Sequence, residues 1–138
     1  MNRAVVVAAL AVACPGATPA DIGRSLFEGR SPLVGRIAGQ DIVLPAQASR
    51  CVNCHLDARP ATGGAAAQRL GPPLTGPSLL ETVQRRGGPP SRYDSTAFCR
   101  LLRTGVDPAF VIVDRSMPRY EIDTADCEAL WAHVTARH

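Results

Sequence analysis

The stretch SRCVNCHLD, residues 49–57, constrains the nature of this 138-residue chain more than any other. It places Cys51 and Cys54 three positions apart and puts His55 directly after the second cysteine. Strings of this kind occur in redox-active dithiols, in halves of structural zinc sites and in covalent attachment sites of haem. The residues on either side of the motif must therefore distinguish three chemistries.

The surroundings of the motif favour haem attachment. A thioredoxin-like dithiol belongs in a βαβ unit, and the sequence does not alternate strand and helix patterns. A structural zinc site needs four ligands, commonly from two Cys-x-x-Cys pairs, whereas Cys99 and Cys127 stand singly on separate expected helices. In a c-type site, two thiols about one helical turn apart bind the vinyl groups on one porphyrin edge, and the next residue's imidazole reaches the iron. We therefore expect one haem c, bound covalently through Cys51 and Cys54, with His55 as an axial iron ligand.

The N-terminus has the layout of a secretory signal peptide. A positively charged start, ten apolar residues (AVVVAALAVA) and a small-residue end (ATPA) precede Asp21. The apolar stretch is too short to span a bilayer as a helix. The sequence thus predicts a signal peptide over residues 1–20, a single domain over residues 21–138 and an exported protein of the bacterial periplasm, where c-type haem is attached.

A second interpretation of the N-terminus stays open. LAVAC, residues 10–14, resembles a bacterial lipobox, in which Cys14 would become the lipidated first residue of the mature protein. The alanine three positions before this cysteine is not the preferred residue there, so cleavage before Asp21 is favoured. The alternative adds a lipid anchor at Cys14, and neither interpretation includes a membrane span.

Charge and composition argue against nucleic-acid binding and favour a cofactor within the core. The 15 basic residues, all of them arginine, face 12 acidic residues, for a formal net charge of +3. So small and dispersed an excess does not predict nucleic-acid binding, which needs a clustered basic face. One Trp, two Tyr and three Phe, beside 12 Gly and 12 Pro, give a thin core. A cofactor in the centre of the domain would complete that core.

The patterns outside the motif predict an all-α domain of short helices and long loops. Helices are expected over residues 22–29, 78–86, 95–104 and 125–136. The capping signals behind them are Asp21, Ser78 with Glu81, Asp94 or Ser95, and Asp123. Residues 31–47 are expected to form an extra loop or small hairpin before the motif, and residues 59–77 and 106–122 to be irregular.

An iron held by one histidine needs a sixth ligand or has an open position. Downstream candidates are Met117, His133 and His138. Met117 is the one methionine left after removal of the signal peptide, and it lies in an expected loop just before Pro118. His133 lies beside the apolar stripe of the last helix and is expected to pack there, and His138 is expected to fray at the terminus. We therefore expect Met117 to bind the iron opposite His55.

Four stretches, in this order along residues 21–137, resemble a monohaem class I cytochrome c. They are GRSLF with Gly23 and Phe27, the motif CVNCH, GPPL, and MPRYEI with the last helix. The resemblance implies the class I cytochrome c fold, with short helices and long loops around one covalent haem, and Gly23 and Phe27 meeting the last helix. It also implies thioether bonds from Cys51 and Cys54, His55 as proximal ligand, Met117 as distal ligand, and a hydrogen bond from His55 to the carbonyl of Pro72.

The function implied by this set is one-electron transfer, with no bond made or broken in a substrate. The protein would be a carrier rather than an enzyme, or the electron-accepting cytochrome subunit of an exported dehydrogenase. Its partners would be redox proteins: a dehydrogenase as donor, and an oxidase or another cytochrome as acceptor. The sequence has no lysine, so the lysine-ringed docking face of mitochondrial relatives is missing. An open-site haem protein (gas-binding or peroxidase-like) and a non-haem metal or redox module are the alternatives.

Two smaller predictions concern residues outside the motif. Export favours a disulfide between Cys99 and Cys127 over two buried free thiols. In the turn RRGGPPSRY, hydrogen bonding to a haem propionate and simple surface exposure remain alternatives for Arg85, Arg86, Arg92 and Tyr93.

Overall fold

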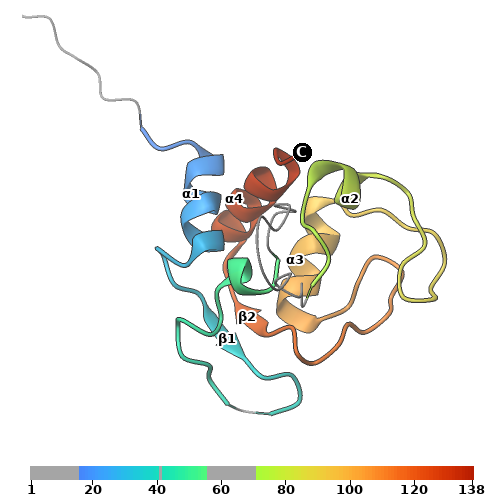
Figure 1. Ribbon diagram of the computed structural model, residues 1–138, viewed down its shortest axis with the longest axis horizontal. Helices are drawn as coiled ribbons and strands as arrows, with labels where there is room; N and C mark the ends of the chain where they lie inside the picture. Colours follow the sequence, from blue (N-terminus) through green and yellow to red (C-terminus); the bar gives the residue numbers. More distant parts are fainter. Residues whose placement is uncertain (1–15, 41, 56–70) are drawn as a thin grey trace, which may run out of the picture.

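The computed structural model describes residues 16–40, 42–55 and 71–138. Its elements, in chain order, are α1 (Pro19–Glu28), β1 (Val34–Arg36), the 3₁₀ turn η1 (Cys51–Asn53), α2 (Gly76–Leu80), α3 (Ser95–Thr104), β2 (Arg119–Glu121) and α4 (Thr124–Thr135). Helices make up most of the regular structure and long loops join them (Figure 1). The predicted small, mostly helical, loop-rich domain is therefore present, but the label all-α omits a two-stranded sheet.

Helices α1 and α4 lie side by side and form the main helix pair (Figure 1). Their closest approach is at Gly23, where an added Cβ would collide with the carbonyl oxygen of Ala129. One turn further along α1, the ring of Phe27 packs on the ring of His133, with 5.3 Å between the centroids. The meeting of Gly23 and Phe27 with the last helix, which the resemblance implied, is thus found in the structure.

Helix α1 begins earlier than its predicted start. Thr18, not Asp21, is the N-cap: its hydroxyl accepts from the amide of Asp21 at 3.2 Å, and the Asp21 carboxylate accepts from the amide of Thr18 at 3.1 Å. Asp21 is thus the third residue of a capping box. Gly29, at φ 74°, ends the helix in a left-handed conformation, as predicted.

Helix α3 matches its predicted range and is joined covalently to α4. Asp94 caps it by accepting from the amide of Ala97 at 2.7 Å, and Gly105 ends it. Cys99 of α3 and Cys127 of α4 form a disulfide, with 5.9 Å between their Cα atoms and a sequence separation of 28. The predicted pairing of these two cysteines is confirmed.

The helix predicted over residues 78–86 is wrong beyond its first turn. Helix α2 begins at Gly76 and ends at Leu80, and Thr75 is its N-cap. The hydroxyl of Ser78, which was expected to cap a helix of its own, instead accepts from the amide of Thr75 at 2.9 Å. The next residues turn away from the helix, because Val83 pairs with Ser91 in an antiparallel bridge.

The sheet joins two parts of the chain that are far apart in sequence. Strand β1 pairs antiparallel with β2, with Val34 opposite Glu121, Gly35 opposite Tyr120 and Arg36 opposite Arg119. The chain after β1 folds back on itself as expected of a small hairpin, since Arg36 bridges to Val43. The pairing with β2 was not predicted, and the prediction that residues 106–122 are irregular throughout is wrong at Arg119–Glu121.

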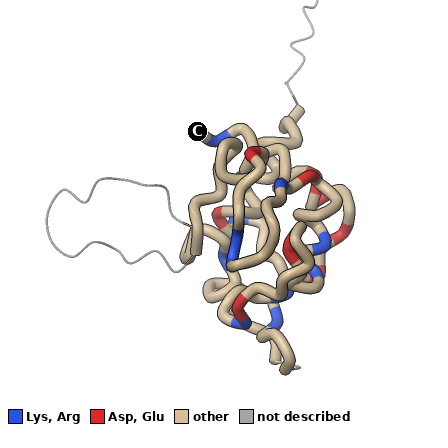
Figure 2. The backbone as a smooth tube through the Cα atoms, turned by 90° about the vertical axis from the view of Figure 1, so that its right-hand side faces the viewer, with Lys and Arg blue, Asp and Glu red and all other residues tan. Residues whose placement is uncertain are grey.

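The core lies between the helices and continues under the sheet. Its most deeply buried side chains include Leu26, Phe27, Phe98, Leu102, Cys127, Leu130 and Val134. Arginine and acidic positions are interspersed along the chain in the view of Figure 2. Within residues 16–40, 42–55 and 71–138, no helix is long and apolar enough to cross a bilayer.

Candidate functional site

The Cys-x-x-Cys-His motif folds as a single tight turn. Residues Cys51–Asn53 form η1, and the amide of His55 donates to the carbonyl of Cys51 at 2.9 Å. Cys51 is buried and Cys54 is half-buried, and neither is in a disulfide. Burial raises the pKa of the Cys51 thiol to about 11, so this thiol is protonated at neutral pH. The two thiols and the imidazole are thus presented within one turn of backbone.

The imidazole of His55 is held in a fixed orientation. Its Nδ1 lies 2.7 Å from the carbonyl oxygen of Pro72, to which it donates, and Nε2 is left as the nitrogen that could bind a metal. Gly71 lies against the ring, and a Cβ there would be only 2.8 Å from Nδ1. Burial lowers the pKa of His55, the hydrogen bond to Pro72 opposes this shift in part, and the nearby guanidinium groups of Arg137 and Arg86 lower the pKa further. The ring is therefore neutral at physiological pH, which is the form that binds metals.

The GPPL segment is tied to the motif by backbone as well as by the histidine. The amide of Gly71 donates to the carbonyl of Cys54 at 3.1 Å, so Pro72 is held directly beside His55. Residues 56–70, which connect His55 to Gly71 along the chain, fall outside the described ranges. Most of them belong to the loop predicted over residues 59–77.

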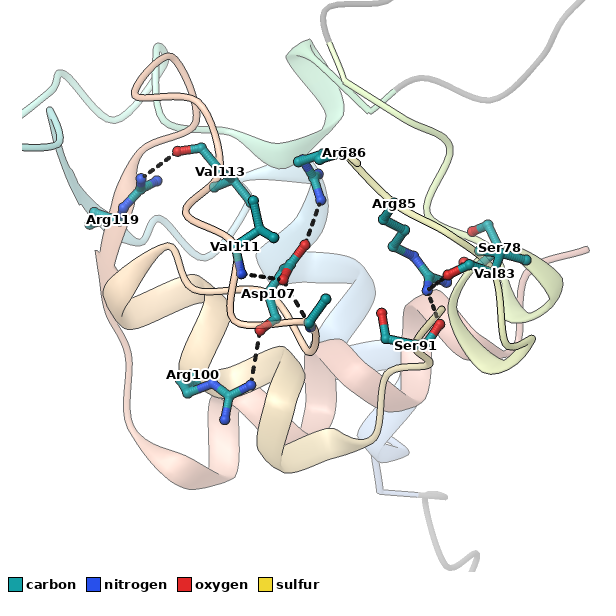
Figure 3. Close-up of polar contacts among 11 residues, drawn as sticks. Ser78, Val83, Arg85, Arg86, Ser91, Arg100, Asp107, Val111, Val113 and Arg119 are labelled. Carbon is teal, nitrogen blue, oxygen red and sulfur yellow. Dashed lines mark hydrogen bonds and ion pairs between the residues drawn. The ribbon is translucent and has the colours of Figure 1, made fainter. Parts of the chain in front are cut away.

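Met117 lies in the loop that leads into β2, as predicted, and is half-buried against the core. Its amide donates to the carbonyl of Asp114 at 3.2 Å. Arg119 donates to the carbonyl of Met117 at 2.6 Å. It also donates to the carbonyl of Val113 at 3.1 Å (Figure 3). The backbone around Met117 is therefore fixed by hydrogen bonds, while its thioether is outside any helix.

The other two histidines take no part in this site. His133 packs in the α1–α4 interface against Phe27, as expected of a structural histidine. His138 is exposed beyond the end of α4.

In the arginine-rich turn after α2, Arg85 and Arg86 bind different partners (Figure 3). Arg85 donates to the carbonyls of Ser78, at 2.6 Å, and of Ser91, and it stacks on the ring of Tyr93, 5.1 Å from its centroid. It therefore stabilises the turn itself. Arg86 instead donates to the carboxylate of Asp107 at 3.3 Å.

Asp107 is the residue of this region that sequence patterns missed. Its side chain is fully buried and accepts from the amides of Ala109 and Val111, at 2.9 and 2.8 Å, and from Arg86 (Figure 3). Its own carbonyl accepts from Arg100 at 3.0 Å. The available signal was the Asp-Pro step at residues 107–108, because an aspartate at such a step commonly accepts from amides of the turn that follows.

The donor set fits a covalently attached haem. It consists of two unpaired thiols, a neutral histidine with its ring oriented by a carbonyl, and a methionine in a hydrogen-bonded loop. It does not fit a four-cysteine zinc site, because Cys99 and Cys127 are bonded to each other. Within the described ranges, no group of three or more His, Cys, Asp or Glu side chains is arranged to hold a metal ion directly.

Comparisons with protein-family models, with curated proteins and with solved structures give no match to this chain. Its function therefore has to be inferred from the chemistry of the residues described above.

Proposed function

We propose that this protein is an exported one-electron carrier with a single c-type haem attached through Cys51 and Cys54, and with His55 and Met117 as axial ligands. The observation that carries the proposal is the 2.7 Å hydrogen bond from His55 Nδ1 to Pro72, made within a Cys-x-x-Cys-His turn whose thiols are both free. Such a bond fixes the tautomer and the plane of a metal-binding imidazole.

Each residue of the set has a distinct task in this proposal. When bound, the haem supplies a one-electron couple. Cys51 and Cys54 anchor it, and the Pro72 carbonyl keeps His55 Nε2 pointed at the iron position. The Met117 thioether, a soft ligand, favours the ferrous state and so raises the reduction potential. The α1–α4 pair and the Cys99–Cys127 disulfide keep the surrounding domain rigid.

The finer fold assignment, a class I cytochrome c fold, is part of the same proposal. The close crossing of α1 and α4 at Gly23, with Phe27 against α4, supports it. The location proposed is the periplasm, where the partners would be a dehydrogenase as donor and an oxidase or another cytochrome as acceptor. The protein would then serve as a free carrier or as the cytochrome subunit of a dehydrogenase.

The decisive experiment is to express the full chain together with a c-type haem maturation system. The expected product is a protein whose mass includes one haem after complete denaturation, and whose reduced spectrum has the sharp α band of a c-type haem. A Cys51→Ala/Cys54→Ala double variant is the matched control and should release any haem on denaturation. A wild-type chain that carries no covalent haem would refute the proposal and favour a non-haem module.

A further inference from the structure

The loop that contains Met117 is attached to the segment just before the haem motif. We call residues 33–40 and 42–49 the pre-motif segment. Strand β1 of this segment pairs with β2, which begins two residues after Met117. The sheet therefore connects the proposed sixth ligand to the chain that leads into Cys51.

A buried hydrogen bond reinforces this connection. The hydroxyl of Tyr120 donates to the carbonyl of Ser49 at 2.7 Å, and both residues are buried, at 6% and 3% exposure. The hydroxyl of Ser49 in turn lies 3.1 Å from the carbonyl of Leu33 and 3.2 Å from that of Ala46. Ser49 thus joins both ends of the pre-motif segment to the strand that follows Met117.

The sheet also leaves no room for a side chain at its centre. A Cβ on Gly35 would lie 2.8 Å from the Cβ of Ser49 and 3.3 Å from the Cβ of Pro118, the residue directly after Met117. Because a Cβ cannot move without its own backbone, contacts this close to the Cβ atoms of Ser49 and Pro118 require glycine at position 35. Any larger residue at position 35 would push Ser49 and Pro118 apart.

We propose that the pre-motif segment positions Met117, through Tyr120 and Gly35, and thereby limits the access of external ligands to the sixth coordination position of the iron. This inference rests on the proposed haem function. An external ligand must displace Met117 together with its loop, and the loop is held by the sheet and by the Tyr120–Ser49 bond. Tyr120 and Gly35 are then positioning residues, because they act through Met117.

The test is a titration of the ferric holoprotein with imidazole, followed by the haem spectrum and by loss of the methionine-to-iron charge-transfer band. Tyr120→Phe removes one buried hydrogen bond and keeps the ring, so imidazole should bind about fivefold more tightly. Gly35→Ala should strengthen imidazole binding by about tenfold or more, because neighbouring backbone must move. Val34→Ala, an exposed neighbour in the same strand, should bind imidazole like the wild type.

A second control separates positioning from a general loss of stability. Asp94→Ala removes the N-cap of α3 and should lower the unfolding midpoint without changing imidazole affinity. If Asp94→Ala increases the affinity as much as Tyr120→Phe does, general stability explains the effect and the inference is wrong. It is also wrong if Tyr120→Phe has wild-type affinity, and this variant decides the matter alone if Gly35→Ala does not fold.

Failure of the inference is distinguishable from failure of the proposed function. A wild-type protein with covalent haem and a methionine-to-iron band retains the proposed function whatever the variants do. A wild-type protein without that band overturns both Met117 ligation and the role given to Tyr120.

Discussion

At the scale of single residues, Asp107 places a carboxylate where water does not reach it. Two backbone amides and the guanidinium of Arg86 surround its oxygens, and they close the loop that follows α3. A buried carboxylate with this many donors stabilises the loop, whereas loss of the carboxylate leaves the donors without an acceptor in the protein interior. The first part of the loop between α3 and β2, residues 107–111, therefore depends on the side chain of Asp107.

Asp107→Ala should lower the free energy of unfolding of the holoprotein by about 2–4 kcal/mol, because two amides and a guanidinium lose their acceptor. Denaturant unfolding followed by far-UV circular dichroism measures this change. Glu128→Ala removes an exposed carboxylate of α4 and should change stability by no more than about 0.5 kcal/mol. Equal stability of the two variants would contradict the role given to Asp107.

Met117 is the residue that distinguishes an electron carrier from an open-site haem protein. The wild-type ferrous protein should resist carbon monoxide, whereas Met117→Ala should bind it readily, because the sixth position becomes free. Absorbance after mixing with carbon monoxide measures both. Ile112→Ala, an exposed change just before the same loop, should resist carbon monoxide like the wild type. Rapid uptake by the wild type at neutral pH would instead favour a gas-binding or peroxidase-like protein.

The sequence was sufficient to predict that the residues of a local motif lie together. Cys51, Cys54 and His55 are adjacent, and the resemblance added the contact from Pro72 that the structure contains. Tyr120 lies in the MPRYEI stretch of the resemblance, but its bond to Ser49 could not be predicted, because the two residues lie 71 positions apart. A hydrogen bond of this kind depends on the fold and leaves no periodic pattern in the sequence.

At the scale of elements, the α1–α4 crossing depends on the absence of a side chain at Gly23. A methyl group there would meet the backbone of Ala129, and backbone cannot move aside as the end of a flexible side chain can. The two helices would have to separate along the length of their contact.

Gly23→Ala should lower the free energy of unfolding by about 1–3 kcal/mol despite the better helix propensity of alanine. Ile22→Ala, which changes an exposed neighbour in the same helix, is the matched control and should have a smaller effect. Thermal or denaturant unfolding of both holoproteins provides the measurement. A Gly23→Ala protein as stable as the wild type would mean that the helices do not cross at this position.

The elements that were predicted well begin and end with strong local signals. Helices α3 and α4 have aspartate N-caps, at Asp94 and Asp123, and Gly105 ends α3. Helix α2 was misplaced because two overlapping capping patterns compete, and Thr75 is the residue that caps it. Strand β2 was not predicted because three residues carry too little pattern, and its stability comes from pairing with β1.

At the scale of the whole molecule, the Cys99–Cys127 disulfide joins the two helices that carry much of the core. On the chain-entropy account, closing a loop of this length stabilises the fold by about 3–4 kcal/mol. The proposed thioether bonds are not cleaved by thiols, but dithiothreitol would also reduce a ferric haem iron, so the comparison is made on protein whose iron is already ferrous.

Dithiothreitol should therefore lower the melting temperature of the ferrous holoprotein to that of a ferrous Cys99→Ser/Cys127→Ser variant, and the ferrous variant itself should not respond to dithiothreitol. Differential scanning calorimetry with and without dithiothreitol measures both effects. A variant that still responds to reductant would indicate a different cysteine pairing.

The burial of Cys51 has a consequence for how the protein matures. Four cysteines follow residue 50 and could pair in three ways; two of them form a disulfide, and on the proposed function the other two would have to stay reduced until haem is attached. A thiol whose pKa is raised to about 11 is a poor attacking group at neutral pH, so Cys51 reacts slowly in thiol exchange. On the proposed function, the burial of Cys51 would help to keep this thiol reduced while the Cys99–Cys127 disulfide forms. In the oxidising compartment proposed for it, folding before haem attachment would be the order that avoids wrong disulfides.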